Sequence, residues 1–338
     1  MEDIANVPNR DKISLILAGG EIIHKRVSLG AEVEPLEGEE LTAGLSAEIK
    51  EKVFVVDWSY QPMSHYTLRM CSDLLQLAGT QIENGSAGVA ISAGTQSLTE
   101  VAYFASLVWN YPQPLVFVAS IVCANTRGAE TELRLNQAVQ SAASQSCWGQ
   151  GPLICVQDEL YAAADLCQLS NYSRTGFVAL PCGPLAKFCE PRGDLKFLRS
   201  TRRSGRIMDI GTLPARNVEI LDASLGGGDI LLSALVESRV AELDGLVISA
   251  FGGGDVPPSW APLLRKIVRA NVPVVLASRC PMGRVQPGQD FEGASARLLE
   301  MGLISAGSLT SLQARIRLSM GLGAELKDQE LRAWMLDE

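Results

Sequence analysis

Short apolar runs alternate with amphipathic segments through the first half of the chain. The apolar runs are typical of buried strands, and they cover residues 13–17, 53–56, 88–92, 114–118 and 153–156. The segments between them carry apolar residues at helical spacing, as at 38–52 with Leu41, Leu45 and Ile49 and at 68–78 with Met70, Leu74 and Leu77. This alternation of strand and helix predicts a doubly wound, mostly parallel α/β sheet.

Two small-residue loops follow buried strands of the predicted sheet. One contains Gly20 and Glu21, and the other contains Gly94, Thr95 and Gln96. Because the carboxyl ends of parallel strands meet at one edge, where ligands bind in such folds, we expect both loops at that edge. Residues 97–100 have the Ser-x-x-Glu form of a capping box. This form predicts that the second loop ends at a helix N-terminus, which favours a nearby anion.

The periodic pattern divides the chain into four segments. It is lost at residue 193, where Arg, Gly and Ser become frequent, and it returns near 216. We therefore predict an N-terminal domain over 1–192, a linker over 193–215, a smaller C-terminal α/β domain over 216–325 and a helical tail over 326–338.

Composition excludes several classes of protein. The 338 residues carry a net charge of −9, which disfavours nucleic acid and anionic membranes as partners. No apolar stretch reaches the length of about 18 residues that a membrane span needs, and residues 1–12 lack the apolar core of a secretion signal. The eight cysteines form no C-x-x-C pair, and the two histidines neighbour no cysteine motif. We expect a cytoplasmic protein with reduced thiols, no metal and no cofactor.

Four stretches resemble motifs of the bacterial-type L-asparaginase and glutaminase family, in the family's order. They cover residues 18–23, 93–104, 251–257 and 274–283, and the resemblance as a whole spans 13–323. It implies a two-domain asparaginase-like fold that acts on a small-molecule amide. It also implies a homodimer or homotetramer in which a neighbouring subunit helps to close each site.

The resemblance implies a mechanism in which one threonine attacks a side-chain amide while a second threonine, an aspartate and a lysine assist proton transfer. Thr95 stands at the second threonine position, whereas Glu21 occupies the nucleophile position and Gln96 the aspartate position. Gln168 matches the lysine, and Tyr60 matches a substrate-binding serine. Neutral amides only hydrogen-bond, and a carboxylate at position 21 would repel an aspartate product. We therefore predict weak or absent activity on asparagine.

Three side chains form the predicted catalytic set. Glu21 is a general base or a carboxylate nucleophile, Thr95 is a nucleophile or a hydrogen-bonding group, and Tyr60 is a proton donor or part of the pocket wall. For Asp255 the sequence leaves open a second role, capping the helix after Pro258. The predicted substrate-binding residues are Gly20, Ser59, Gln61, Gly94, Gln96, Ser97, Gln168 and Asp255.

Two functions remain open at this point. The first is an amidohydrolase repurposed for the C–N bond of a different small amide, imide or lactam. The alternative is a catalytically inactive protein that keeps the fold and pocket to bind a ligand or partner. The asparaginase-like subunit of a tRNA-dependent amidotransferase is disfavoured, because the chain begins almost directly at the first predicted strand. Polar groups gathered at the strand ends favour the enzyme, and the loss of charged catalytic partners favours the alternative.

Overall fold

The computed structural model describes residues 12–27, 32–36, 38–173, 175–189, 193–201 and 205–336. The chain forms two compact units. The first contains residues up to Arg203 together with Asp209–Gly211, and the second contains Ser204–Met208 together with Thr212–Glu338.

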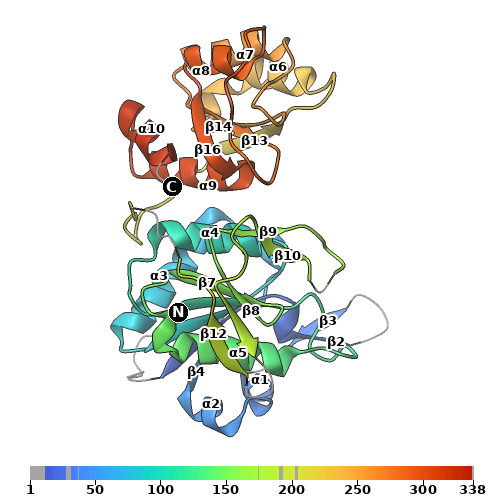
Figure 1. Ribbon diagram of the computed structural model, residues 1–338, viewed down its shortest axis with the longest axis vertical. Coiled ribbons are helices and arrows are strands. Elements are labelled where there is room, and N and C mark those ends of the chain that lie inside the picture. Colours follow the sequence, from blue (N-terminus) through green and yellow to red (C-terminus); the bar gives the residue numbers. More distant parts are fainter. Residues whose placement is uncertain are drawn as a thin grey trace. The chain divides into compact units, whose positions relative to one another are not determined.

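The first unit is built on an eight-stranded sheet (Figure 1). Five neighbouring strands are parallel, and β8, β11 and β12 extend the sheet antiparallel at one side. This confirms the predicted doubly wound, mostly parallel sheet. In spatial order the strands are β12 (Asp194–Phe197), β11 (Ala186–Cys189), β8 (Glu159–Ala162), β7 (Pro152–Val156), β6 (Leu115–Ala119), β5 (Gly88–Ala93), β1 (Ile13–Ala18) and β4 (Val53–Ser59).

Helices cover both faces of this sheet. One face carries α3 (Leu68–Glu83) and α4 (Leu98–Val108), and the other carries α5 (Thr131–Ala143) with α1 (Gly38–Ala43) and α2 (Ala47–Lys52) (Figure 1). Strands β1, β5, β6 and β7 are buried along their whole length, so the core lies on both sides of them. The smaller elements are η1 (Glu21–Ile23), β2 (His24–Arg26), β3 (Val33–Pro35), η2 (Met63–His65), η3 (Gln145–Cys147), β9 (Leu166–Gln168) and β10 (Phe177–Ala179).

The structure corrects two local predictions. The helical spacing across 38–52 is divided between α1 and α2, because the Ser46 hydroxyl accepts a hydrogen bond from the Ile49 amide and starts a second helix. Gly44 at the break packs so closely that a Cβ there would lie 2.5 Å from the Glu132 side chain. In addition, β12 lies inside the predicted linker, where it pairs with β11. The predicted domain boundaries themselves remain predictions.

The second unit is a smaller parallel sheet with helices on both faces. Its strands lie in the order β13 (Val218–Asp222), β14 (Gly245–Ala250), β15 (Val274–Ser278) and β16 (Ile304–Thr310). One face carries α6 (Asp229–Ser238), η4 (Val240–Glu242), α7 (Trp260–Arg269) and α8 (Ser295–Glu300). The other carries α9 (Ser311–Gly323) and α10 (Asp328–Leu336). The predicted smaller α/β domain is thereby confirmed.

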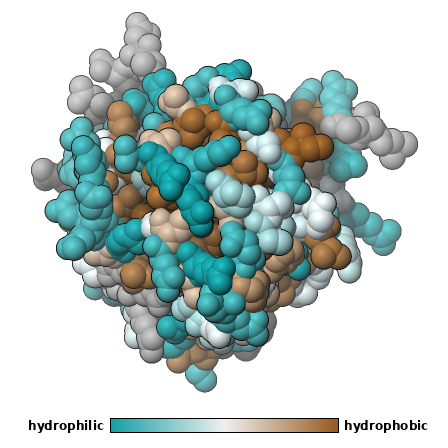
Figure 2. Space-filling model, turned by 90° about the horizontal axis from the view of Figure 1, so that it is seen from above, coloured by the Kyte–Doolittle hydropathy of each residue, from teal (hydrophilic) through white to brown (hydrophobic). Residues whose placement is uncertain are grey.

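The surface of the second unit carries both apolar and polar side chains. Figure 2 looks onto it from the side of α6, α7 and α8, and brown apolar side chains lie among teal polar ones. Ile230 and Leu231 of α6 are exposed, whereas Trp260 of α7 is fully buried beneath Gly228. Within the described residues of both units, no helix is long and apolar enough to cross a membrane.

All eight cysteines are free thiols, and four of them, Cys71, Cys123, Cys147 and Cys155, are buried in the first unit. Burial raises the pKa of Cys71, Cys147 and Cys155 to about 12, from an ordinary value of 9.0. Above pH 9 the unfolded chain therefore loses protons that the folded chain keeps, and the free energy of unfolding falls as pH rises toward 12.

We expect this alkaline loss to be smaller in a Cys155→Ala variant. The thiol of Cys155 contributes about 1.4 kcal/mol to the loss between pH 8 and pH 10, since one pKa unit corresponds to about that free energy. Urea unfolding at the two pH values measures the loss for wild type, Cys155→Ala and the exposed control Cys189→Ala. An equal loss in wild type and Cys155→Ala would refute this prediction.

Candidate active site

The loops after β1, β4 and β5 meet at one edge of the sheet in the first unit. β1 pairs in parallel with β4 and with β5, which confirms the predicted shared edge. Gly19 and Gly20 have φ of +91° and +92°, and a Cβ on either would collide with a neighbouring loop. The collision at Gly19 would be with the Gln61 carbonyl oxygen at 2.5 Å, and at Gly20 with the Ala93 carbonyl oxygen at 2.2 Å. Glycine at both positions is therefore what lets three backbones meet.

Two hydroxyl groups tie this junction together, and neither was predicted as part of the site. The Ala18 amide donates to Ser92 Oγ at 3.0 Å, and Ser92 Oγ donates to the Gly19 carbonyl at 3.2 Å. The Tyr66 hydroxyl donates to the Ala18 carbonyl at 2.6 Å, and burial raises the pKa of Tyr66 to about 12. Ser92 was detectable as a polar residue in an apolar strand, whereas Tyr66 carries no such signal.

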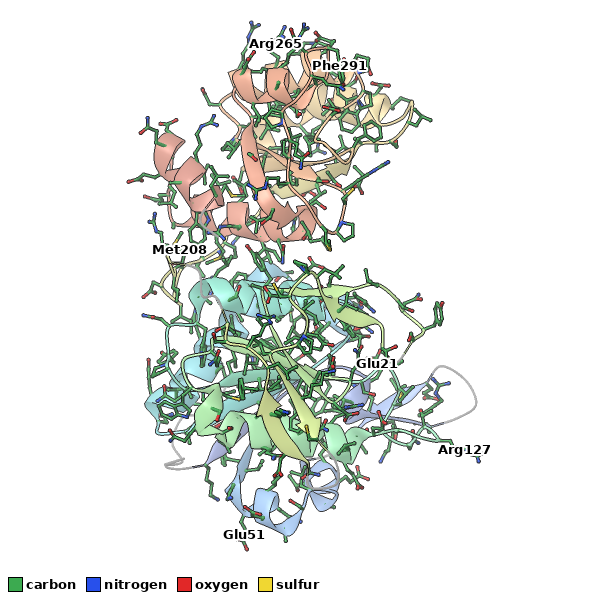
Figure 3. The ribbon with its side chains drawn as sticks, viewed as in Figure 1. Glu21, Glu51, Arg127, Met208, Arg265 and Phe291 are labelled. Carbon is green, nitrogen blue, oxygen red and sulfur yellow. The ribbon has the colours of Figure 1, made fainter. Side chains whose placement is uncertain are left out.

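Glu21 follows the glycine pair and begins η1 (Figure 3). Its Oε1 accepts a hydrogen bond from Gln96 Nε2 at 2.8 Å, so the structure brings these two predicted site residues together. The other carboxylate oxygen, Oε2, is buried and has no hydrogen-bond partner among the described residues. His24 Nδ1 donates to the Gly20 carbonyl at 2.6 Å and holds the turn that presents Glu21. The arrangement leaves one carboxylate oxygen able to accept a proton.

Tyr60 and Ser59 lie at the end of β4. The Tyr60 hydroxyl donates to Asp57 Oδ1 at 2.6 Å, and its ring meets the edge of the His24 ring with centroids 6.4 Å apart. Ser59 Oγ accepts from the Gln61 amide at 3.2 Å. The phenol of Tyr60 is thus directed to Asp57, a carboxylate near the end of β4 for which the sequence pattern predicted no role.

The predicted capping box after β5 is wrong. Ser97 is the N-cap residue of α4, but its side chain makes no capping hydrogen bond. Ser97 Oγ donates instead to the Met63 carbonyl at 3.0 Å, because the loop after β4 lies close enough to compete for it. A Cβ on Gly94 would also lie 3.2 Å from Met63 Cβ. Gly94 therefore leaves space for Met63, and Ser97 binds the Met63 carbonyl, so both residues contribute to the contact between the two loops.

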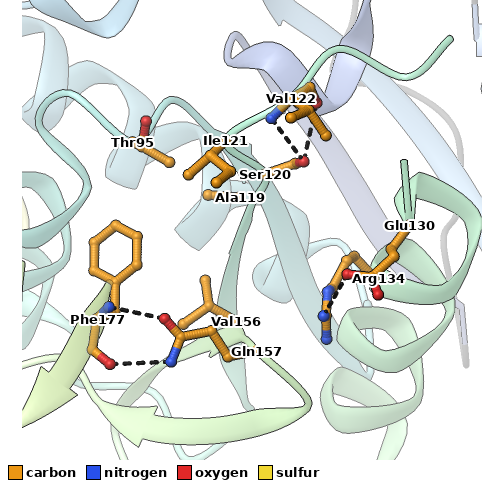
Figure 4. A pocket seen from close by; sticks show the side chains of 10 residues that line it. All are labelled: Thr95, Ala119, Ser120, Ile121, Val122, Glu130, Arg134, Val156, Gln157 and Phe177. Atoms are coloured by element: carbon orange, nitrogen blue, oxygen red, sulfur yellow. Dashed lines mark hydrogen bonds and ion pairs between the residues drawn. The ribbon is translucent and has the colours of Figure 1, made fainter. Parts of the chain in front are cut away.

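Thr95 lines a small pocket, and Glu21 is not among the residues that line it (Figure 4). The pocket has a volume of about 40 Å³, and the described residues offer Thr95 Oγ1 no hydrogen-bond partner. Gln168, at the end of β9, pairs across the hairpin with Phe177, and its Nε2 donates to the Ser170 carbonyl at 3.2 Å. The residues lining the pocket are Thr95, Ala119, Ser120, Ile121, Val122, Glu130, Arg134, Val156, Gln157 and Phe177.

Asp255 belongs to the second unit. Its Oδ1 accepts a hydrogen bond from the Ser295 amide at 2.9 Å, at the first residue of α8. The alternative role predicted for it, capping the helix after Pro258, is wrong, because α7 begins after Ser259 without a side-chain cap. Asp255 instead satisfies an amide of a helix that lies 40 residues further along the chain. Within the described residues of both units, no cluster of three or more potential ligands is arranged to hold a metal ion.

Two family models match this chain almost from end to end. One is described as "Asparaginase, N-terminal" and matches residues 12–202, and the other as "Glutaminase/Asparaginase C-terminal domain" and matches 217–335. The chain belongs to the asparaginase family. The resemblance found in the four sequence motifs is thereby confirmed.

Different relatives of this chain in the asparaginase family are named for different activities. A probable L-asparaginase of Deinococcus radiodurans is 30% identical over 270 residues, which are 79% of this chain and 81% of the relative. An L-asparaginase of Bacillus licheniformis is 24% identical over 315 residues, 93% of this chain and 96% of the relative. One subunit of a glutamyl-tRNA(Gln) amidotransferase of Methanobrevibacter smithii is 23% identical over 338 residues, 95% of this chain and 74% of the relative.

A solved structure shares the asparaginase fold over the full chain. It is a probable cytoplasmic L-asparaginase from Campylobacter jejuni, with a TM-score of 0.85 and 20% sequence identity, covering 97% of this chain and 100% of that one. At this identity the likeness establishes the two-domain fold.

Proposed function

We propose that this asparaginase-family chain hydrolyses the C–N bond of a small amide, imide or lactam other than asparagine. The observation that supports the proposal is the carboxylate of Glu21 at the shared strand edge. One of its oxygens is held by Gln96 at 2.8 Å, and the other is buried without a partner among the described residues. A buried oxygen that accepts no hydrogen bond is costly, so a fold tolerates it where a ligand or a reacting proton supplies the missing partner.

In the proposed reaction, Glu21 Oε2 takes a proton from a water molecule as the water oxygen attacks the substrate carbonyl carbon. Thr95 Oγ1 donates a hydrogen bond to the carbonyl oxygen, which gains negative charge in the transition state. The tetrahedral intermediate then expels the amine, which receives the proton from Glu21, so that a primary amide gives a carboxylic acid and ammonia. Gln96 orients Glu21 throughout, because its Nε2 donates to Oε1.

The same residues disfavour asparagine. The carboxylate of Glu21 repels the negatively charged groups of asparagine and of its aspartate product. Gln96 and Gln168 are neutral, so neither replaces the charge of the aspartate or the lysine that the family mechanism uses at those positions. Tyr60, already donating to Asp57, takes the place of a substrate-binding serine.

We expect asparagine and glutamine to be poor substrates. Ammonia release by the pure protein, measured for asparagine, glutamine and a series of uncharged primary amides, tests this. The specificity constant kcat/KM should be lower for asparagine than for the best uncharged amide by about 100-fold or more, because a site rejects a group that it leaves unpaired. Turnover of asparagine at a rate equal to that of every uncharged amide would contradict the proposal.

A second candidate is a protein that binds an amide without turnover. It is favoured by the hydrogen bonds of Tyr60 to Asp57 and of Gln168 to the Ser170 carbonyl, which occupy side chains at two of the family's functional positions. The ammonia assay separates the two candidates when it is combined with direct measurement of amide binding, since only the hydrolase releases ammonia.

We further propose that the protein works in the cytoplasm as a homodimer or homotetramer. Eight free cysteines, three of them exposed, suit a reducing compartment. The family resemblance implies that a neighbouring copy helps to close each site. Light scattering should give a mass of two or four 36.2-kDa chains, and a stable monomer with full activity would contradict this.

A further inference from the structure

Five of the ten residues that line the pocket beside Thr95 are apolar. Ala119, Val156 and Phe177 are 3–4% exposed and lie on three different strands, and Ile121 and Val122 are half-buried on the loop after β6. Figure 4 shows these side chains around one space that also faces Thr95. Its volume of about 40 Å³ suits a short aliphatic group.

Apart from Thr95, the polar side chains of the lining make hydrogen bonds or ion pairs within the protein. Ser120 Oγ donates to the Val122 carbonyl at 2.9 Å and accepts from the Val122 amide at 3.2 Å, which folds its hydroxyl back onto its own loop. Gln157 Nε2 donates to the Phe177 carbonyl at 3.0 Å, while its Oε1 accepts from the Phe177 amide at 2.8 Å. Thr95 is therefore the polar lining residue that has its hydroxyl left for a ligand within the described part of the chain.

The charges of the pocket disfavour a carboxylate. Its cation, Arg134, lies at the end of the pocket away from Phe177 and Thr95 (Figure 4). Arg134 Nη2 donates to Glu130 Oε2 at 2.7 Å, and Nη1 donates to Asp158 Oδ1 at 2.6 Å. Two carboxylates thus compensate one guanidinium, and a negatively charged ligand would meet an excess of negative charge. An uncharged group meets no such penalty.

The backbone of Phe177 is held by the turn that joins β7 to β8. Gln157 and Asp158 join β7 to β8 with φ of +59° and +61°. Asp158 is held by Arg134 and by Gln137, whose Nε2 donates to Asp158 Oδ1 at 2.8 Å. Gln157 then binds both backbone polar groups of Phe177. The turn therefore fixes the backbone from which the Phe177 ring reaches the pocket.

We propose that this pocket accepts a short, uncharged alkyl group of the amide substrate, that Phe177 limits the length of this group, and that Gln157 positions Phe177. The inference rests on the proposed function, because it names the substrate class of the same site. The substrate's carbonyl lies at Thr95, and its alkyl group lies between Phe177, Val156 and Ala119.

The test uses acetamide, propionamide, butyramide and asparagine as probes, with the full-length protein. Binding is measured by ligand-observed NMR, and turnover by ammonia release. We expect wild type to prefer a short alkyl amide to asparagine. The Phe177→Leu variant should shift the preference toward the longer alkyl chain by about 10-fold, since one methylene in an apolar pocket changes specificity by that order.

Two further variants separate positioning from general damage. Gln157→Asn keeps a residue that tolerates positive φ but shortens the side chain that reaches Phe177, so it should shift chain-length preference in the same direction as Phe177→Leu. Phe188→Leu changes an aromatic residue that packs against the core of the same unit without lining the pocket, and it should leave the preference unchanged.

The outcomes distinguish this inference from the proposed function. Butyramide binding that responds to Phe177→Leu without any ammonia release supports the pocket and refutes the hydrolase. Turnover with the same chain-length preference in wild type and Phe177→Leu refutes the pocket and leaves the hydrolase standing. Tighter binding of asparagine than of every alkyl amide, or no binding of any alkyl amide, also overturns the inference.

Discussion

Replacement of Glu21 by glutamine lowers kcat/KM for the best amide substrate by about 10²–10⁴-fold, the range that a general base contributes. Glutamine has the shape of glutamate, and its carbonyl oxygen still accepts the hydrogen bond that Gln96 Nε2 now makes at 2.8 Å. It cannot take a proton from an attacking water molecule. We expect kcat to fall much more than KM rises, because the lost interaction belongs to the transition state.

Stability measurements show whether Glu21→Gln loses activity through the chemistry or through unfolding. The variant should unfold in urea with a free energy within about 1 kcal/mol of wild type, since its hydrogen bond is kept. Glu48→Gln is a matched control, as it removes an exposed carboxylate that pairs with Lys52 at 2.7 Å on α2. This control should retain wild-type kcat/KM. Equal turnover by wild type and Glu21→Gln would remove Glu21 from the mechanism and leave Thr95 and Tyr60 as the remaining candidates.

A Gly20→Ala variant should lose more than about 3 kcal/mol of unfolding free energy and all activity. Gly20 has φ of 92° and ψ of 159°, a conformation that is essentially restricted to glycine and costs other residues about 1–3 kcal/mol. The added Cβ would also lie 2.2 Å from the Ala93 carbonyl oxygen, which is backbone and cannot move without separating β1 from β5. Urea unfolding and the amide assay measure the two effects.

Gly149→Ala separates the conformational part of this loss from the steric part. Gly149 has φ of +69°, and a Cβ there would meet nothing within 4 Å. We expect it to lose about 1–2 kcal/mol, the cost of a left-handed conformation alone, with activity retained. Similar losses for Gly20→Ala and Gly149→Ala would show that the close approach of the Gly20 and Ala93 backbones contributes little.

The sequence alone determined the strands of both sheets that carry continuous apolar runs, because such a run has no other place than the interior. It also located the loops of Glu21 and Thr95 at one edge, since the direction of parallel strands settles where they end. Short strands such as β12, whose side chains are exposed or half-buried, escaped prediction. They form because a neighbouring strand offers backbone hydrogen bonds. The amino-acid pattern of the short strand itself does not indicate that such a neighbour is present.

Only the tertiary structure decided which partner each polar side chain found. Ser97 had the sequence of a helix cap but bonds to the carbonyl of Met63, and Asp255 satisfies α8 rather than the nearer α7. Gln157 carried no signal at all, yet it binds both backbone polar groups of Phe177, a residue that lines the pocket with Thr95. The physical reason is range: burial of apolar residues follows from local pattern, whereas a hydrogen bond depends on which distant segment comes within about 3 Å.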